Sequence, residues 1–258
     1  MIRIKNILLV ITIVSLFHMP TFSQKKADLI NTRWAFNPVV ADGELNDWAD
    51  SLSMFNEETN LYYGLANDDK NVYLAIRSAS KQDLTKILAG GISFSANIEG
   101  KKKNAPTVIF PVLDRTPGKI RNSREQPEVE ERQKQILSRI KDIRVAGFKE
   151  IIDGAISLQN TYGIRAAASF DKNNNLVQEI IIPLSLLNLS TANSGEVTYS
   201  IRVNGLQTPA VAVAPRQTNQ RQPMGGMYGN QFPQRNSSIS KLLTSTEFFI
   251  KSRLATKQ

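Results

Sequence analysis

Two short runs of alternating apolar and polar residues, separated by four polar residues, stand out along the first half of the chain. The runs cover 60–66 and 71–77, and the residues between them are Asn-Asp-Asp-Lys at 67–70. Alternation at every second residue predicts antiparallel strands, and the polar linker predicts a hairpin turn. With all four linker residues in the turn, position 66 lies opposite position 71. The predicted core-facing side chains are Leu61, Tyr63, Leu65, Val72, Leu74 and Ile76.

Short runs of the same kind recur along the rest of the chain. The predicted strands are 92–98, 107–112, 151–158, 163–170, 176–182, 197–203 and 242–254. Regularly spaced short strands are typical of a β-sandwich rather than an α/β sheet. Residues 80–91 predict one short helix that Gly90-Gly91 ends, and 184–189 predict a helical turn. The fold class predicted is all-β, an antiparallel jelly-roll β-sandwich with an inserted charged helix and one long flexible loop.

The inserted helix is predicted over about residues 125–144. Its apolar stripe follows a spacing of four and three residues and consists of Val129, Gln133, Ile136, Ile140 and Ile143. Acidic residues precede basic ones, which suits the helix dipole. The helix either covers part of the sandwich or docks a partner.

The long loop is predicted at about residues 207–238, where Gln, Asn, Pro and Gly dominate. Such a composition buries too little apolar surface to order itself. The segment is either disordered or folds onto a partner, for which an envelope protein is one candidate. Because a predicted strand follows it, the loop is an insertion and not a tail.

The first 23 residues have the three-part pattern of a secretory signal peptide. Arg3 and Lys5 precede an apolar run over 7–17, and Pro20 and Ser23 follow. The run is shorter than the roughly 20 residues that span a bilayer. We therefore expect a bacterial protein exported to the periplasm or the extracellular space, with 24–258 as a single domain and no membrane span after cleavage.

Several chemistries are excluded by residue types that the mature chain lacks. The chain has no cysteine, and its one histidine, His18, lies inside the predicted signal peptide. Nucleophilic catalysis by Ser-His-Asp or Cys-His, ordinary zinc sites and disulfides are thereby excluded. Net charge is +9 for the whole chain, but the basic residues are scattered and no aromatic-interleaved basic stripe occurs. Hydrolysis by a pair of carboxylates stays open in principle, but nothing in the sequence positions such a pair. We predict a non-enzyme without cofactors that binds no nucleic acid.

The order of several short motifs resembles the carbohydrate-binding family 9-like modules and their DOMON-like relatives. An Asp-Gly-containing opening at 40–48 ends in Trp48, the hairpin follows, and then come 91–94 and a Glu-x-x-x-Pro strand at 179–183. The resemblance implies a jelly-roll sandwich and carbohydrate binding. Some relatives hold haem on a Met/His pair, and that role cannot apply without a histidine in the mature chain. Trp48 matches a structural position of the opening motif and is predicted to lie in the core.

Candidate ligand-binding residues lie on the outer hairpin face, where aromatic side chains could stack on sugar rings. They are Tyr62, Tyr73, Arg77 and Asn60, together with Trp34 from a preceding segment. The alternative is that each aromatic ring shields the small residue opposite it, or that the inserted helix covers this face. Two function classes therefore stay open: a glycan-binding module, and a structural or protein-interaction component of the cell envelope.

Four aspartates are weak candidates for a calcium site, because loop carboxylates suit this ion. They are Asp42, Asp47, Asp68 and Asp69. Aspartate is equally an ordinary turn residue, and no dense series of alternating aspartates is present. The sequence favours turns over a metal site at these positions.

Overall fold

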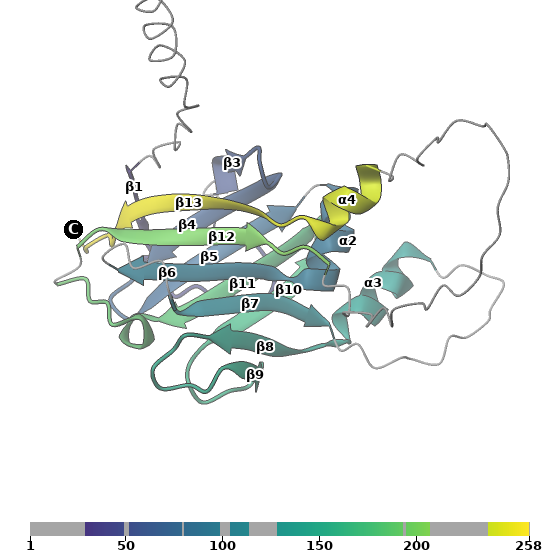
Figure 1. The fold of residues 1–258 in the computed structure, drawn as a ribbon. Coiled ribbons are helices and arrows are strands. Elements are labelled where there is room, and N and C mark those ends of the chain that lie inside the picture. Colours follow the sequence, from purple (N-terminus) through teal and green to yellow (C-terminus); the bar gives the residue numbers. More distant parts are fainter. Residues whose placement is uncertain are drawn as a thin grey trace, which may run out of the picture.

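The computed structural model describes residues 29–48, 52–78, 80–98, 104–113, 128–192, 195–206 and 237–257. These residues form two β-sheets packed face to face, with the α-helices toward one end (Figure 1). The predicted all-β sandwich is confirmed. The predicted signal peptide at 1–23 and most of the predicted long loop, 207–236, lie outside the described residues.

The larger sheet has seven strands in the spatial order β1-β13-β12-β6-β7-β8-β9. Their bounds are β1 Leu29–Asn31, β13 Thr246–Arg253, β12 Val197–Val203, β6 Ile92–Ile98, β7 Thr107–Leu113, β8 Ile140–Ala146 and β9 Gly154–Ser157. All neighbours are antiparallel except β1 and β13, which run parallel. The parallel pair was not predicted.

The smaller sheet has six strands and the order β10-β11-β5-β4-β2, with β3 also paired to β4. Their bounds are β10 Arg165–Phe170, β11 Leu176–Pro183, β5 Asn71–Ser78, β4 Leu61–Asn67, β2 Arg33–Trp34 and β3 Met54–Asn56. Strand β2 runs parallel to β4, and the other pairs are antiparallel. Strands β2 and β3 are too short to have been recognised by alternation.

The core lies between the two sheets and takes side chains from both. All six residues predicted to face it are at most 7% exposed and belong to one apolar cluster. Tyr63 of β4 and Phe248 of β13 join the layers, with ring centroids 5.0 Å apart. The prediction of the inner hairpin face is confirmed.

The predicted hairpin register is wrong by two residues. In the structure Leu65 pairs with Leu74, and Tyr62 pairs with Arg77 rather than with Ala75. The cause is a tighter turn, since the backbone N–H of Asp68 still donates to the carbonyl of Asn71 across the hairpin. Because a shift of two residues restores the same side of the pleat, the assignment of residues to faces survived the error.

Two helices lie where the sequence predicts them, but one is shorter than predicted. Helix α2 (Lys81–Gly90) begins after Ser80, whose side chain accepts from the backbone N–H of Asp83, and ends at Gly91 with φ 74°. Helix α3 covers only Val129–Leu137, and Ile140 and Ile143 belong to strand β8. Their side chains enter the core while those between them face outward. Pairing of β8 with β7 therefore overrode the helical spacing.

The remaining differences concern the ends of elements. Strands β9 and β10 are shorter than the predicted 151–158 and 163–170. The predicted helical turn is the short helix η3 (Leu184–Leu187). Helix α4 (Ser237–Leu243) precedes β13, where the sequence predicted loop and then strand. Within β13, Phe248 and Ile250 face inward and Phe249 is half exposed, as the alternation predicts.

One buried asparagine ties both ends of the described chain to the hairpin. The Asn67 side-chain oxygen accepts from the Thr32 hydroxyl at 2.5 Å and from the backbone N–H of Ala255 at 2.8 Å. Its amide donates to the carbonyls of Asp68 and Ala255, both at 3.0 Å. All four hydrogen bonds are needed because Asn67 is fully buried.

No helix of the described residues is long and apolar enough to cross a bilayer.

Candidate functional site

The outer face of the six-stranded sheet is largely covered by residues 35–48, which we call the cover segment. A second apolar cluster forms beneath it, separate from the core between the sheets. The cluster consists of Ala35, Val39, Trp48, Leu52, Ala66, Tyr73, Ala75 and Ile181, with Ala41 and Leu45 packed against it. The segment that contains the opening motif thus acts as a third layer over part of this sheet.

A single buried carboxylate holds the cover segment to the sheet. Glu179 lies in the middle of β11, and its side chain accepts three hydrogen bonds from the cover segment. The Trp48 indole N–H donates at 2.7 Å, the Gly43 backbone N–H at 2.9 Å and the Asp42 backbone N–H at 3.1 Å. The two sequence motifs, far apart in the chain, therefore meet at Glu179.

The local geometry around Glu179 depends on small residues. The β5 and β10 residues opposite Glu179 are Ala75 and Ala167, whose side chains are small. Gly43 has φ 85°, and a Cβ there would lie 3.0 Å from the backbone of Ala168 and of Ser169. Only glycine therefore allows the cover segment to approach β10 this closely.

Burial raises the pKa of Glu179 from its ordinary 4.5 to about 7, and the nearby Asp42 charge adds to the shift. The three hydrogen bonds oppose this effect, because they stabilise the ionised form. A carboxyl group that titrates near neutrality is often a sign of catalysis. Glu179 is 0% exposed, however, and its three hydrogen-bond donors are all N–H groups of the cover segment, so the carboxylate is sealed from any substrate in this structure.

Beside the cover segment, one cross-strand row of the outer face holds exposed aromatic side chains. We call Phe55, Tyr62 and Arg77 the aromatic row. These residues lie directly opposite one another on β3, β4 and β5. The Phe55 and Tyr62 ring centroids are 4.8 Å apart with planes tilted by 43°, and the Arg77 guanidinium carbon lies 4.7 Å from the Tyr62 centroid. Phe55 is 46% exposed, while Tyr62 and Arg77 are half-buried.

The structure brings two of the predicted ligand-binding residues into this row and places the other three elsewhere. Tyr73 is only 2% exposed under the cover segment, and its hydroxyl donates to Asp68 at 2.6 Å. Asn60 is exposed beside the row and donates to Asp83 at 3.3 Å. Trp34 is half-buried in β2, opposite Asn67. Tyr73 therefore has no free ring face for stacking. Trp34, in β2, lies beside the last residue of β4, whereas Tyr62 lies near the beginning of that strand.

Sequence reasoning missed Phe55 and the role of Glu179. Strand β3 has three residues, too few for alternation to reveal, so Phe55 gave no usable signal. Glu179 did give one, because it is the single charged residue of the largely apolar strand β11, and buried charges require partners. Trp48 is 1% exposed, so it is buried as predicted, but it lies in the second apolar cluster and not in the core between the sheets.

Three of the four aspartates considered for calcium accept hydrogen bonds from backbone N–H groups in the structure. Asp68 accepts from Lys70 and Asn71, Asp42 accepts from Glu44, and Asp47 accepts from Val40, seven residues before it. The Asp68 and Asp42 contacts are those by which aspartate stabilises turns. Across the described ranges no group of three acidic, cysteine or histidine residues lies close enough to hold a metal ion.

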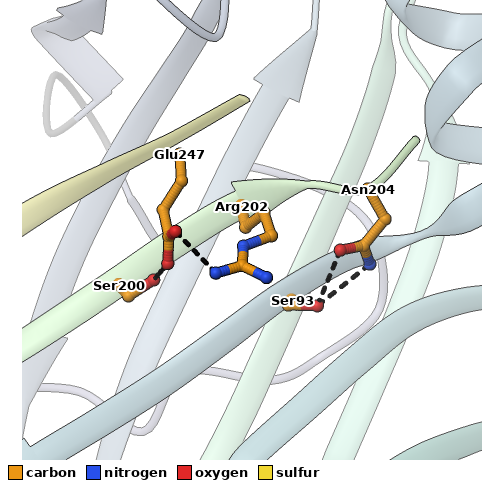
Figure 2. Close-up of polar contacts among 5 residues, drawn as sticks. All are labelled: Ser93, Ser200, Arg202, Asn204 and Glu247. Atoms are coloured by element: carbon orange, nitrogen blue, oxygen red, sulfur yellow. Dashed lines mark hydrogen bonds and ion pairs between the residues drawn. The ribbon is translucent and has the colours of Figure 1, made fainter. Parts of the chain in front are cut away.

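The outer face of the seven-stranded sheet carries a different, polar cluster (Figure 2). The Glu247 carboxylate accepts from Arg202 at 2.6 Å and from the Ser200 hydroxyl, across the β12–β13 pair. Next to it, Ser93 of the neighbouring strand β6 and Asn204, directly after β12, exchange hydrogen bonds of 2.9 and 3.1 Å. Because these groups satisfy one another, they leave few polar atoms for a ligand.

Comparisons with known proteins add little to this geometry. No family model matches the chain, and no curated protein matches it significantly. Among solved structures, the chain is similar to a carbohydrate-binding module of family 9 from Caldicellulosiruptor kristjanssonii in complex with glucose. The identity is 10%, the TM-score is 0.39, and the match covers 90% of this chain and 97% of that one.

Proposed function

We propose that the protein is a non-catalytic exported module that binds a glycan on the aromatic row. The observation that carries the proposal is the cross-strand contact of Phe55, Tyr62 and Arg77 beside the cover segment. Aromatic faces stack on the C–H groups of sugar rings, and neighbouring polar groups bind the hydroxyls. The Phe55 and Tyr62 rings project from paired strands, and Arg77 packs against Tyr62. These side chains therefore lose little conformational entropy when a ligand binds.

The absence of catalysis is part of the same proposal. The only carboxylate among the described residues with a strongly raised pKa is Glu179, and three N–H donors of the cover segment occupy it. The single histidine of the chain is His18, inside the predicted signal peptide. A glycosidase needs two accessible carboxyl groups on either side of a bond, and the aromatic row contains none.

The test is binding to a broad glycan array, followed by calorimetry on the sugars that score. Tyr62→Ala and Phe55→Ala each remove a ring of the row, and we expect affinity to fall about five- to tenfold for each. Phe249→Ala is the matched control, because Phe249 is a half-exposed phenylalanine on the outer face of the other sheet. It should leave binding unchanged. A folded protein that binds no glycan on the array, or loses as much affinity through Phe249→Ala, contradicts the proposal.

A further inference from the structure

Phe55 is the member of the aromatic row with the most exposed ring. Tyr62 lies between the other two, with the Phe55 centroid 4.8 Å and the Arg77 guanidinium carbon 4.7 Å from its own centroid. Among the described strands β3 pairs with β4 alone, so the side of Phe55 away from Tyr62 borders no further strand. Phe55 is also 46% exposed, and it is therefore the ring on which a sugar can stack.

The surroundings of this ring are acidic. The turn between β3 and β4 lies directly beside Phe55, and it contains Glu57 and Glu58, both exposed. Asp83 joins them, because its carboxylate accepts a hydrogen bond of 3.3 Å from Asn60 of the same turn. Three carboxylates therefore lie at the β3 end of the aromatic row.

Acidic residues outnumber basic ones in this part of the chain. The stretch 42–83 holds nine acidic residues and three basic ones, although the whole chain has a net charge of +9. Lys70 lies in the turn at the opposite end of the hairpin, and Lys81 begins helix α2. Arg77 lies two strands from Phe55, roughly 10 Å away by the spacing of paired strands. In the ion pairs that the described residues form with one another, none of the three carboxylates takes part.

We propose that the glycan bound by the aromatic row is cationic and contains hexosamine residues with a free amine. This inference rests on the proposed function. An ammonium group in place of the C2 hydroxyl leaves the C–H face of the sugar unchanged, so the ring can stack on Phe55 and carry its charge at the periphery. Each exposed carboxylate contributes little to binding such a charge, but the three at this end of the row act together.

The experiment compares two oligosaccharides that differ only at C2. Cellohexaose carries hydroxyl groups there and the corresponding glucosamine hexamer carries ammonium groups, and calorimetry at a pH that keeps the amines protonated measures the binding of each. We expect the glucosamine hexamer to bind about five- to twentyfold more tightly at low ionic strength, and this difference should shrink in high salt. Joint replacement by Glu57→Gln and Glu58→Gln should remove most of the difference.

The matched control is the joint replacement Glu130→Gln and Glu131→Gln. It makes the same change of charge on two consecutive exposed glutamates, in helix α3 instead of the turn between β3 and β4. The difference between the two hexamers should persist in this variant. If the control removes the difference as fully as the Glu57 and Glu58 replacements do, the net charge of the protein is responsible and the proposal is overturned.

The outcomes also separate this inference from the proposed function. Equal affinity for the two hexamers, with binding still lost in Phe55→Ala, overturns the hexosamine assignment and leaves glycan binding intact. An oligolysine of the same charge that binds as tightly, with the same dependence on Glu57 and Glu58, also overturns it, because the surface would then accept any cation. Absence of binding to both hexamers and to every glycan of the array overturns the proposed function itself.

Discussion

The outer face of the six-stranded sheet is covered by residues 35–48, whereas the outer face of the seven-stranded sheet presents exposed charged side chains at Arg202, Lys251 and Arg253. On the first face, the cover segment is held by the buried side chains of the second apolar cluster and by the hydrogen bonds of the buried Glu179 carboxylate. The second face is held together by hydrogen bonds and ion pairs between side chains that range from buried to exposed, as in the cluster of Ser200, Arg202 and Glu247. Burial stabilises far more per residue than exposed ion pairs do.

The comparison also explains where a ligand site can form. In the polar cluster of the seven-stranded sheet, the side chains already hydrogen-bond one another, so few donors and acceptors remain for a ligand. The aromatic row of the six-stranded sheet, in contrast, presents two rings and a guanidinium beside the cover segment. The cover segment contributes to this arrangement, because it hides most of the apolar outer face and leaves the aromatic row accessible. We therefore expect mutations on the two outer faces to differ strongly in their effects on stability.

The largest difference is expected for Trp48→Ala on the covered face. The variant removes a 1% exposed indole from the second cluster and leaves the Glu179 carboxylate without its shortest hydrogen bond. The free energy of unfolding should fall by about 3–5 kcal/mol. Urea denaturation measures it, and Phe249→Ala on the other face should stay within about 1 kcal/mol of the wild type. Equal losses in the two variants would refute the difference between the faces.

The next effect is a dependence of stability on pH. The pKa of Glu179 is raised by burial, and further by Asp42, to about 7 in the folded state against 4.5 when unfolded. Between these values the folded state holds a proton that the unfolded state has released, so the free energy of unfolding falls as pH rises. Denaturation at a series of pH values should show a loss of up to about 3 kcal/mol that begins near pH 4.5 and is complete about one unit above pH 7, once the folded-state group has also lost its proton.

The control for this slope is a pair of substitutions on the two faces. Glu179→Gln should flatten the profile between pH 4.5 and pH 7, because the titrating group is gone. Glu247→Gln changes a carboxylate for which burial is incomplete and should leave the slope in place. A slope that survives Glu179→Gln would show that another group is responsible.

A smaller effect is expected from Gly43→Ala. The residue has φ 85°, and an added Cβ would meet the backbone of Ala168 and Ser169 at 3.0 Å. Strain and the displaced cover segment should lower the free energy of unfolding by about 1–3 kcal/mol. Gly195→Ala is the matched control near the seven-stranded sheet, since no atom lies within 4 Å of its added Cβ. Thermal unfolding should rank Gly43→Ala clearly below Gly195→Ala, and the reverse order would exclude tight packing at Gly43.

The smallest effect is expected on the open face itself. Arg202→Ala removes an ion pair in which the arginine side chain is 47% exposed. Exposed pairs contribute little because water and salt screen them, so stability should change by at most about 1 kcal/mol and less at high salt. Denaturation at low and high ionic strength measures this. A salt-independent loss of several kcal/mol would mean that this cluster is as important as the covered face.

Much of the scaffold could be predicted because the alternation of side chains is a local property of a strand. Leu61, Tyr63 and Leu65 were assigned to the core without knowledge of the partner strand, and the two-residue error in pairing left that assignment unchanged. Helix α2 was equally predictable, because Ser80 and Gly91 mark its ends within a few residues. The prediction failed where a partner strand decided the outcome, as at Ile140 and Ile143.

The candidate site was predicted only in part. Tyr62 and Arg77 were recognised as outward-facing, but the sequence could not show that 35–48 returns to cover Tyr73. Nor could it show that Phe55 joins the row, since β3 becomes a strand only through its pairing with β4. Both features depend on contacts between segments that local patterns do not relate to one another.

The sequence by itself determined which side chains enter the core and where helix α2 begins and ends, and its lack of cysteine excludes disulfides and thiol chemistry. Each of these follows from residue identity and short-range periodicity. The tertiary structure alone decided the length of the hairpin turn, the burial of Glu179 beneath Trp48 and the assembly of the aromatic row. Glu179 and Trp48 are 131 residues apart in the chain, and only the packing of the cover segment against β11 brings them together.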